Sequence, residues 1–172
     1  MTDTVLRAAP QESISSLSDQ TLVLRGRGTF RYLGVKLYTA SFYVSPAVRT
    51  WKEMLGDVPK RIVIDYLHDI PRDAMVQAAE KNLKNNPEID HAKIKKRLQN
   101  LHSRYAAVNK GDEHSLVYFH GKTLLYLNQK LQAEVDGEDF ASAYFSIWLS
   151  KYSISQRLRN ALLGVNSSRK RE

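Results

Sequence analysis

An arginine and a threonine on neighbouring predicted strands are the residues of this sequence best suited to hold an anionic group. Arg27 lies in Gly26-Arg27-Gly28, and Thr39 follows on the next predicted strand. A guanidinium can bind a carboxylate through two charge-assisted hydrogen bonds, and a nearby hydroxyl adds a neutral donor. Both residues fall within an otherwise apolar sheet, where an unpaired charge is strongly unfavourable. Arg27 is therefore predicted either to pair with an internal acid, such as Asp65 or Glu80, or to anchor a ligand.

Several tyrosines accompany these two residues on the predicted strands: Tyr38, Tyr43, Tyr66 and Tyr118. Ligand sites combine apolar walls with a few polar anchors, so these rings could line a hydrophobic cleft. Aromatic residues on strands also serve as ordinary core and cross-strand partners. Tyr38 and Tyr43 are predicted on the same strand as Thr39, and with Arg27 and Thr39 they form the predicted ligand-binding set.

Other kinds of site are not indicated by the sequence. The histidines have no tight metal-ligand spacing with a third ligand. The sequence has no Gly-x-Ser-x-Gly motif and no phosphate-cradling glycine loop. It also has no cysteine, which excludes disulfides and thiolate chemistry. We therefore predict no metal, no cofactor and no serine or cysteine nucleophile.

The chain is basic, with a formal net charge of +8 and a pI near 9.7. The excess is concentrated at 93–97 and 169–171. Such clusters can bind nucleic acid or an anionic membrane. Because 93–97 falls on the polar side of a predicted amphipathic helix, we interpret it as a solvated basic face and predict no nucleic-acid partner.

Periodicity predicts the elements that must position these residues. Alternating and β-branched residues predict strands, and apolar residues at helical spacing predict helices. The predicted strands are 15–24, 29–33, 34–44, 61–67, 115–119, 123–127 and 132–135. The predicted helices are 46–55, 71–83, 86–105, 140–150 and 155–163.

Two of these elements are the most informative about the fold. On the 34–44 strand, Thr39 and Tyr43 share one face, while Tyr38 and Ala40 share the other. The 140–150 helix is apolar nearly all round, so it is predicted to be the most buried element and to lie across the sheet. The order of strands, helices, strands and helices predicts an α+β fold, with an antiparallel sheet and helices packed on one face.

The length of 172 residues predicts one folded domain at 13–164, with a disordered N-terminus at 1–12 and a disordered basic tail at 165–172. No apolar run is long enough for a transmembrane helix, and the sequence as given carries no secretory signal. The oligomeric state is left open.

Two motifs carry a resemblance to a known family. Gly26-Arg27-Gly28 followed by the run at 34–44 resembles the opening core of the chalcone isomerase superfamily. The run at 145–149, followed by Leu158 and the Leu-Leu-Gly at 162–164, resembles its closing signature. The bacterial chalcone-isomerase-like proteins are the best match, over about 22–164. The resemblance implies an open-faced β-sandwich, in which a large antiparallel sheet is covered by a layer of helices with a ligand cleft between them. It also implies a periplasmic location if a signal peptide has been removed, and a cytoplasmic one otherwise.

The resemblance also assigns candidate roles. In the plant enzymes an arginine and a threonine on the early strands bind and polarise a flavonoid, and by spacing these fall on Arg27 and Thr39. The tyrosine and asparagine of the next helical segment align with Asp73 and Glu80, so both are replaced here. Three further family positions also depart from the pattern. A later threonine or serine aligns near Ile147, with Ser146 adjacent, and Ser150 and Ser153 stand where bacterial relatives carry glycine and proline.

A retained arginine without the catalytic residues resembles the fatty-acid-binding branch of the superfamily. We therefore predict a non-catalytic protein that binds a small hydrophobic ligand with an acidic head group held by Arg27, with Thr39 and a tyrosine in support. The ligand tail is expected between the sheet and the 140–150 helix. Two alternatives remain open. One is an isomerase or intramolecular lyase that acts on a chalcone-like substrate through Arg27. The other is a structural or interaction module whose cleft is filled by its own side chains.

Overall fold

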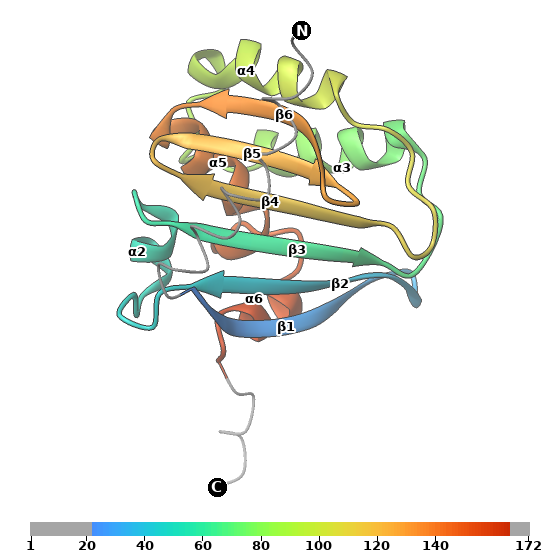
Figure 1. The fold of residues 1–172 in the computed structure, drawn as a ribbon, viewed down its shortest axis with the longest axis horizontal. Helices are drawn as coiled ribbons and strands as arrows, with labels where there is room; N and C mark the ends of the chain where they lie inside the picture. Colours follow the sequence, from blue (N-terminus) through green and yellow to red (C-terminus); the bar gives the residue numbers. More distant parts are fainter. Residues whose placement is uncertain (1–21, 166–172) are drawn as a thin grey trace, which may run out of the picture.

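The computed structural model describes residues 22–165, in which six strands form one antiparallel sheet in chain order (Figure 1). Each strand therefore pairs with the strands next to it in sequence, as consecutive hairpins do. The strands are β1 (Val23–Tyr32), β2 (Val35–Val44), β3 (Lys60–Tyr66), β4 (Glu113–Phe119), β5 (Lys122–Leu127) and β6 (Lys130–Asp136).

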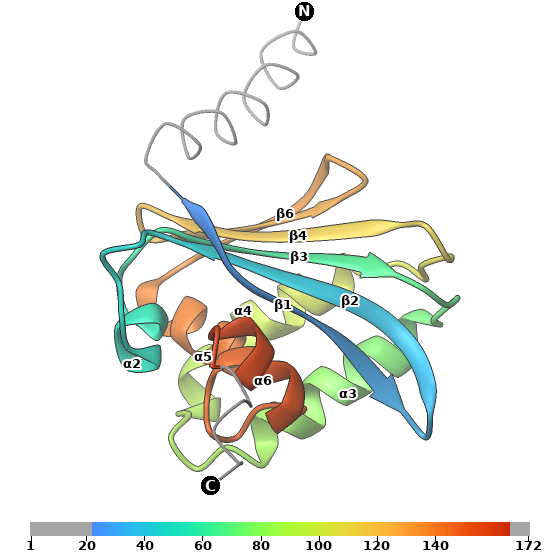
Figure 2. The same ribbon diagram turned by 90° about the horizontal axis from the view of Figure 1, so that it is seen from below.

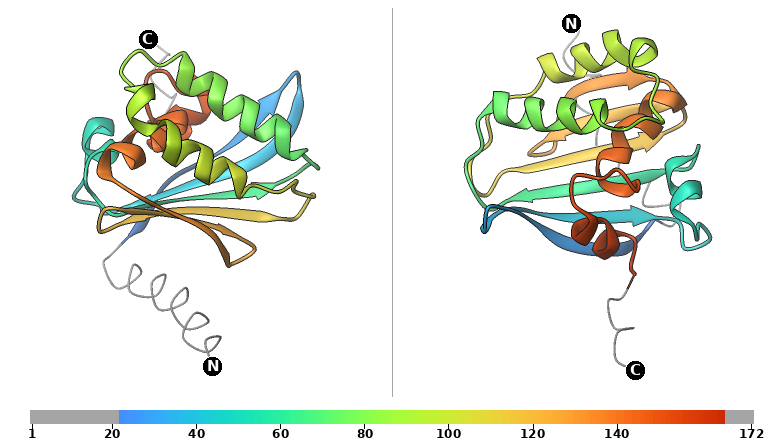
Figure 3. Two further views of the ribbon diagram at one scale, coloured as in Figure 1. Left: turned by 90° about the horizontal axis from the view of Figure 1, so that it is seen from above. Right: turned by 180° about the vertical axis from the view of Figure 1, so that it is seen from behind.

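The helices of residues 22–165 all lie on one face of this sheet (Figures 2 and 3). They are α2 (Trp51–Leu55), α3 (Arg72–Lys84), α4 (His91–Ser103), α5 (Glu138–Leu149) and α6 (Gln156–Leu162). The predicted α+β fold, an antiparallel sheet with a helix layer on one face, is confirmed. None of the helices between residues 22 and 165 is long and apolar enough to cross a membrane.

The core lies between the sheet and the helices. On β2, Tyr38, Ala40 and Phe42 face the helices and are buried, while Thr39 and Tyr43 alternate with them toward the outer face. Helix α5 is buried almost throughout, as its apolar composition predicts. Hydrophobic burial between the two layers is therefore the main contribution to the stability of the fold.

Strand β1 differs from the prediction. The sequence predicts one strand ending at residue 24, a turn at the glycines and a new strand from residue 29, but β1 runs unbroken from Val23 to Tyr32. The glycines are needed for close packing rather than for a turn. A Cβ on Gly26 would overlap the backbone carbonyl of Ala161, and one on Gly28 would come within 2.7 Å of the Ala161 side chain. Strand β1 therefore lies directly against α6, and residues 15–21 of the predicted first strand lie outside the described residues.

Two predicted helix starts are also corrected. Helix α2 begins at Trp51 rather than near Pro46, because Thr50 and Glu53 form a capping box there. Helix α4 begins at His91, where the Asp90 side chain accepts a hydrogen bond from the amide of Lys93. The segments predicted to be disordered, 1–12 and 165–172, lie outside the described residues apart from residue 165.

Candidate ligand-binding site

The predicted ligand-binding residues do not share one face of the sheet. Arg27 is exposed on the outer face, where its Nε donates to Ser41 Oγ at 2.8 Å. Among residues 22–165 it forms no ion pair, so neither Asp65 nor Glu80 is its partner. Thr39 lies on the same outer face, with its hydroxyl 3.5 Å from that of Thr29.

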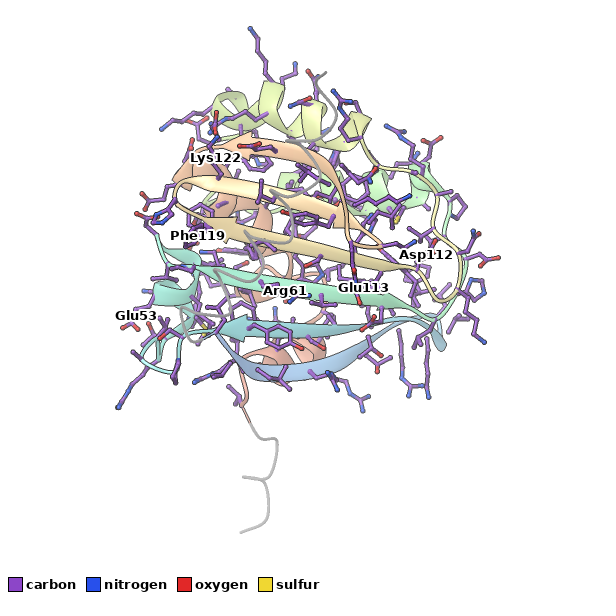
Figure 4. All side chains as sticks on the ribbon, in the orientation of Figure 1. Glu53, Arg61, Asp112, Glu113, Phe119 and Lys122 are labelled. Atoms are coloured by element: carbon purple, nitrogen blue, oxygen red, sulfur yellow. The ribbon has the colours of Figure 1, made fainter. Side chains whose placement is uncertain are left out.

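Tyr43 also lies on the outer face, under the guanidinium of Arg61, whose Cζ is 5.6 Å from the ring centroid (Figure 4, in which the sheet lies in front of the helices). Tyr38 alone of the predicted set faces the helices, and it is 8% exposed. Arg27 and Thr39, the expected anchors of the head group, therefore lie on the opposite side of the sheet from α5, against which the ligand tail is expected. The physical reason is strand alternation: Gly26 and Gly28 occupy the helix-facing positions, so Arg27 between them points outward.

Tyr38 is part of a closed group of aromatic side chains between the sheet and the helices, which we call the aromatic belt. Successive rings in the belt have centroids between 5.2 and 6.1 Å apart. Trp148 Nε1 closes the belt by donating to the Tyr38 hydroxyl at 3.2 Å. Strands β2, β3 and β4 supply Tyr38, Tyr66 and His114, while α4, the residues after it and α5 supply His102, Tyr105, Tyr144 and Trp148.

On the sheet side of the belt, Tyr66 and His114 are joined by a short hydrogen bond. The Tyr66 hydroxyl lies 2.7 Å from His114 Nδ1 and 3.6 Å from Met75 Sδ of α3. Burial lowers the pKa of His114 to about 4. The imidazole is therefore neutral near pH 7, and this part of the belt carries no charge.

On the helix side, four side chains form a continuous hydrogen-bonded chain from the surface to the interior. Glu80 Oε1 lies 3.2 Å from His102 Nδ1, and His102 Nε2 lies 3.2 Å from the Tyr144 hydroxyl. The Tyr144 and Tyr105 hydroxyls are 2.9 Å apart. An ionised carboxylate can only accept, so Glu80 fixes the tautomer of neutral His102 with its proton on Nδ1. Tyr144 then donates to His102 Nε2 and accepts from Tyr105.

Burial keeps the hydroxyls and imidazoles of the belt uncharged. It raises the pKa of Tyr38, Tyr66 and Tyr144 well above the ordinary value, and that of Tyr105 to about 12. It also lowers the pKa of His102, although Glu80 opposes that shift. The belt therefore offers neutral hydrogen-bonding groups in an apolar layer.

Tyr38 differs from the other belt tyrosines in its hydrogen bonding. Its oxygen accepts from Trp148, and among the described residues its hydroxyl hydrogen has no acceptor. The hydroxyls of Tyr66, Tyr105 and Tyr144 each have an acceptor within reach. Tyr38 therefore has a free donor in a buried environment, and a ligand oxygen could accept it.

Other parts of the described chain are less suited to an apolar ligand. Two surface hollows of about 540 and 350 Å³ lie between α2, α4 and α5, and charges of both signs line them, including Lys93 and Asp139. Lys60 is fully buried, but its Nζ donates to the carbonyls of Met54 and Gly56, at 2.8 and 2.6 Å, and lies over the ring of Tyr118. Neither feature combines an apolar wall with a free polar donor, as the belt does at Tyr38.

Most of the belt is missing from the sequence-based prediction. The sequence-based prediction does not include His102 or His114, because the histidines lack metal-ligand spacing, and it does not include Tyr105, because this residue falls on a predicted helix and not on the sheet. A usable signal does exist, because His114 alternates with Leu116 and Tyr118 on a strand face that is otherwise apolar. A polar aromatic residue on such a face needs a hydrogen-bonding partner, which indicates a buried network.

Comparison with known proteins agrees with this fold. The sequence model of the family described as chalcone isomerase-like matches residues 6–164. Among solved structures, a fatty-acid binding protein of Arabidopsis thaliana is similar, with a TM-score of 0.62 and 14% sequence identity over 84% of this chain and 87% of that chain. No curated protein matches at a significant level. The resemblance seen in the sequence motifs is confirmed, and the chain belongs to the chalcone isomerase-like family.

Proposed function

We propose that this protein binds a small hydrophobic ligand with a fatty-acid-like head group in the layer between the sheet and the helices, without catalysing flavanone formation. The observation that carries the proposal is the unused donor of Tyr38 within the aromatic belt. The family membership and the shared fold with a fatty-acid binding protein of Arabidopsis thaliana support it.

The head group would be recognised by hydrogen bonding at Tyr38. An oxygen of the ligand accepts the Tyr38 hydroxyl hydrogen, while Trp148 holds the Tyr38 oxygen from the other side. The belt residues are neutral, so the Tyr38 hydroxyl, and not the Arg27 guanidinium, would bind the head group of the ligand. Such a donor recognises a carboxyl oxygen without requiring a buried cation.

Apolar side chains around Tyr38 provide the wall for the tail. Phe30 stacks on Tyr38 with the ring centroids 5.1 Å apart, and Met75 reaches Tyr66 from α3. Both side chains are half-buried members of the main core, so they lie at its edge rather than at its centre. A tail that packs against them would extend the apolar layer that already holds the sheet and helices together.

The arrangement supports binding over catalysis through Arg27. An isomerase that used Arg27 to polarise a substrate oxygen would need the guanidinium and the tyrosine hydroxyls on one face of the sheet. Arg27 lies on the outer face and Tyr38 on the helix-facing side. The raised pKa of the belt tyrosines also keeps them protonated near pH 7, so they are donors and not bases.

Replacing Tyr38 with phenylalanine should weaken the binding of laurate roughly tenfold, because one buried hydrogen bond of about 1–1.5 kcal/mol is lost while the ring remains. Calorimetric titration measures this effect. Thr39→Val is the matched control, since Thr39 is the next residue along β2 but points to the outer face. Equal laurate affinity in Tyr38→Phe and wild type would refute the role of Tyr38. Failure of the wild type to bind laurate would instead favour a module filled by its own side chains.

A further inference from the structure

The hairpin that joins β1 to β2 exposes apolar side chains at its end. Residues 31–36 form what we call the hairpin tip, with Leu33 and Gly34 as a two-residue connection. Leu33 is 85% exposed, Tyr32 62% and Val35 46%. The tip projects at one end of the sheet, beyond the helices that cover the core (Figure 2). These side chains contribute little to the core, so the fold does not explain them.

The backbone of the tip makes the leucine more unusual. Leu33 has φ of 48° and Gly34 φ of 80°, a pairing that favours asparagine, aspartate or glycine. The two other tight hairpins have polar residues at such positions, with His120 before Gly121 and Asn128 before Gln129. A leucine in this conformation is strained, and its side chain gains no burial in return.

The charged residues of the hairpin tip are also arranged unfavourably for the stability of the sheet. Arg31 and Lys36 are cross-strand partners, and like charges placed opposite each other are unfavourable. Within residues 22–165, neither Arg31 nor Lys36 forms an ion pair with a carboxylate that would offset this repulsion. The tip therefore combines exposed apolar side chains with a pair of cations.

We propose that the hairpin tip docks on an anionic lipid bilayer, with Leu33 and Tyr32 entering the interface and Arg31 and Lys36 binding the acidic head groups. Apolar and aromatic side chains flanked by cations match the layered chemistry of that surface. A bilayer also suits a narrow projecting tip, because a soluble protein partner would need a broader surface.

This inference goes beyond the proposed function and does not depend on it. The docking site and the proposed ligand site would nevertheless be close to each other. Phe30 and Tyr38, which border the proposed ligand site, are cross-strand partners near the hairpin tip. A lipid-like ligand leaving the bilayer at the tip would have a short distance to travel. Docking can nevertheless be measured without any ligand.

The test is sedimentation of the full chain with vesicles of phosphatidylglycerol and phosphatidylcholine in equal amounts, compared with vesicles of phosphatidylcholine alone. Leu33→Asn should lower the partition coefficient on the mixed vesicles about tenfold or more, because it removes the insertion of a leucine. Its melting temperature should equal or exceed that of the wild type, since asparagine suits the turn. Lys36→Gln should lower the partition about fivefold and weaken its salt dependence.

The matched control is His120→Asn, the same kind of change in the β4–β5 turn, and it should partition as the wild type does. Three results would overturn the proposal: a wild type that does not sediment with the mixed vesicles, a Leu33→Asn variant that sediments like the wild type, and an equal loss in His120→Asn. The second result would assign vesicle binding to basic residues elsewhere, such as Arg169, Lys170 and Arg171.

Discussion

Gly26→Ala is expected to lower the free energy of unfolding by about 3 kcal/mol, because the added methyl group has no room against α6. Its Cβ would overlap the carbonyl oxygen of Ala161 and lie 2.7 Å from that of Leu162. Both are backbone atoms in the last turn of α6, so the contact is relieved only by displacing α6 from β1. Urea denaturation of the two proteins measures the difference.

Arg27→Ala is the matched control for this prediction. Arg27 is the neighbouring residue, exposed on the outer face, and its Nε bonds only to Ser41 among the described residues. Its loss should change the free energy of unfolding by less than about 1 kcal/mol. A larger effect for Arg27→Ala than for Gly26→Ala would mean that the arginine, and not the glycine, faces the helices.

Acid should destabilise the protein through His114 by roughly 3 kcal/mol between pH 6.5 and pH 4. The folded pKa of His114 is about 4, below the ordinary value of 6.5, because the imidazole is buried beside Tyr66. Between these two pH values the unfolded state binds more protons than the folded state, so stability falls as the pH falls. The contribution of neutral His114 to the free energy of unfolding is therefore fully present above pH 6.5 and is lost as the pH falls to about 4.

The measurement is urea denaturation at several pH values for the wild type and for His114→Asn, whose side-chain oxygen can still accept from Tyr66. The difference between the two stability curves should be flat above pH 6.5 and slope steadily below it. His68→Asn provides the matched control, because it makes the same substitution at an exposed histidine. Parallel curves for the wild type and His114→Asn would show that His114 titrates as an ordinary exposed histidine.

The fold could be predicted from the sequence because it depends on local periodicity. Alternation on β2 and the apolar surface of α5 correctly indicate one buried face of the sheet under a helix layer. The orientation of Arg27 could not be predicted in the same way. Gly26 and Gly28 occupy the helix-facing positions of β1, and because glycine has no apolar side chain, alternation in the sequence does not reveal that this face is buried.

The aromatic belt was missed for a different reason. Its members come from separate strands, helices and a loop, and Tyr38 and Trp148 are 110 residues apart in the chain. No local pattern states that Trp148 will donate to Tyr38 or that Glu80 will orient His102. Only the tertiary structure brings these groups together, whereas the residues of Gly26-Arg27-Gly28 are adjacent in the sequence.

The central claim is that the ligand lies against Tyr38 and Trp148 and not on the outer face. The chain has two tryptophans, Trp51 and Trp148, so a nitrogen-15 correlation spectrum contains two indole N–H signals, which Trp51→Phe would assign. Titration with laurate should move the Trp148 signal and leave the Arg27 Nε signal unchanged, and in Tyr38→Phe the same movement of the Trp148 signal should require roughly ten times more laurate. Movement of the Arg27 signal with Trp148 unchanged would contradict the claim and place the ligand on the outer face.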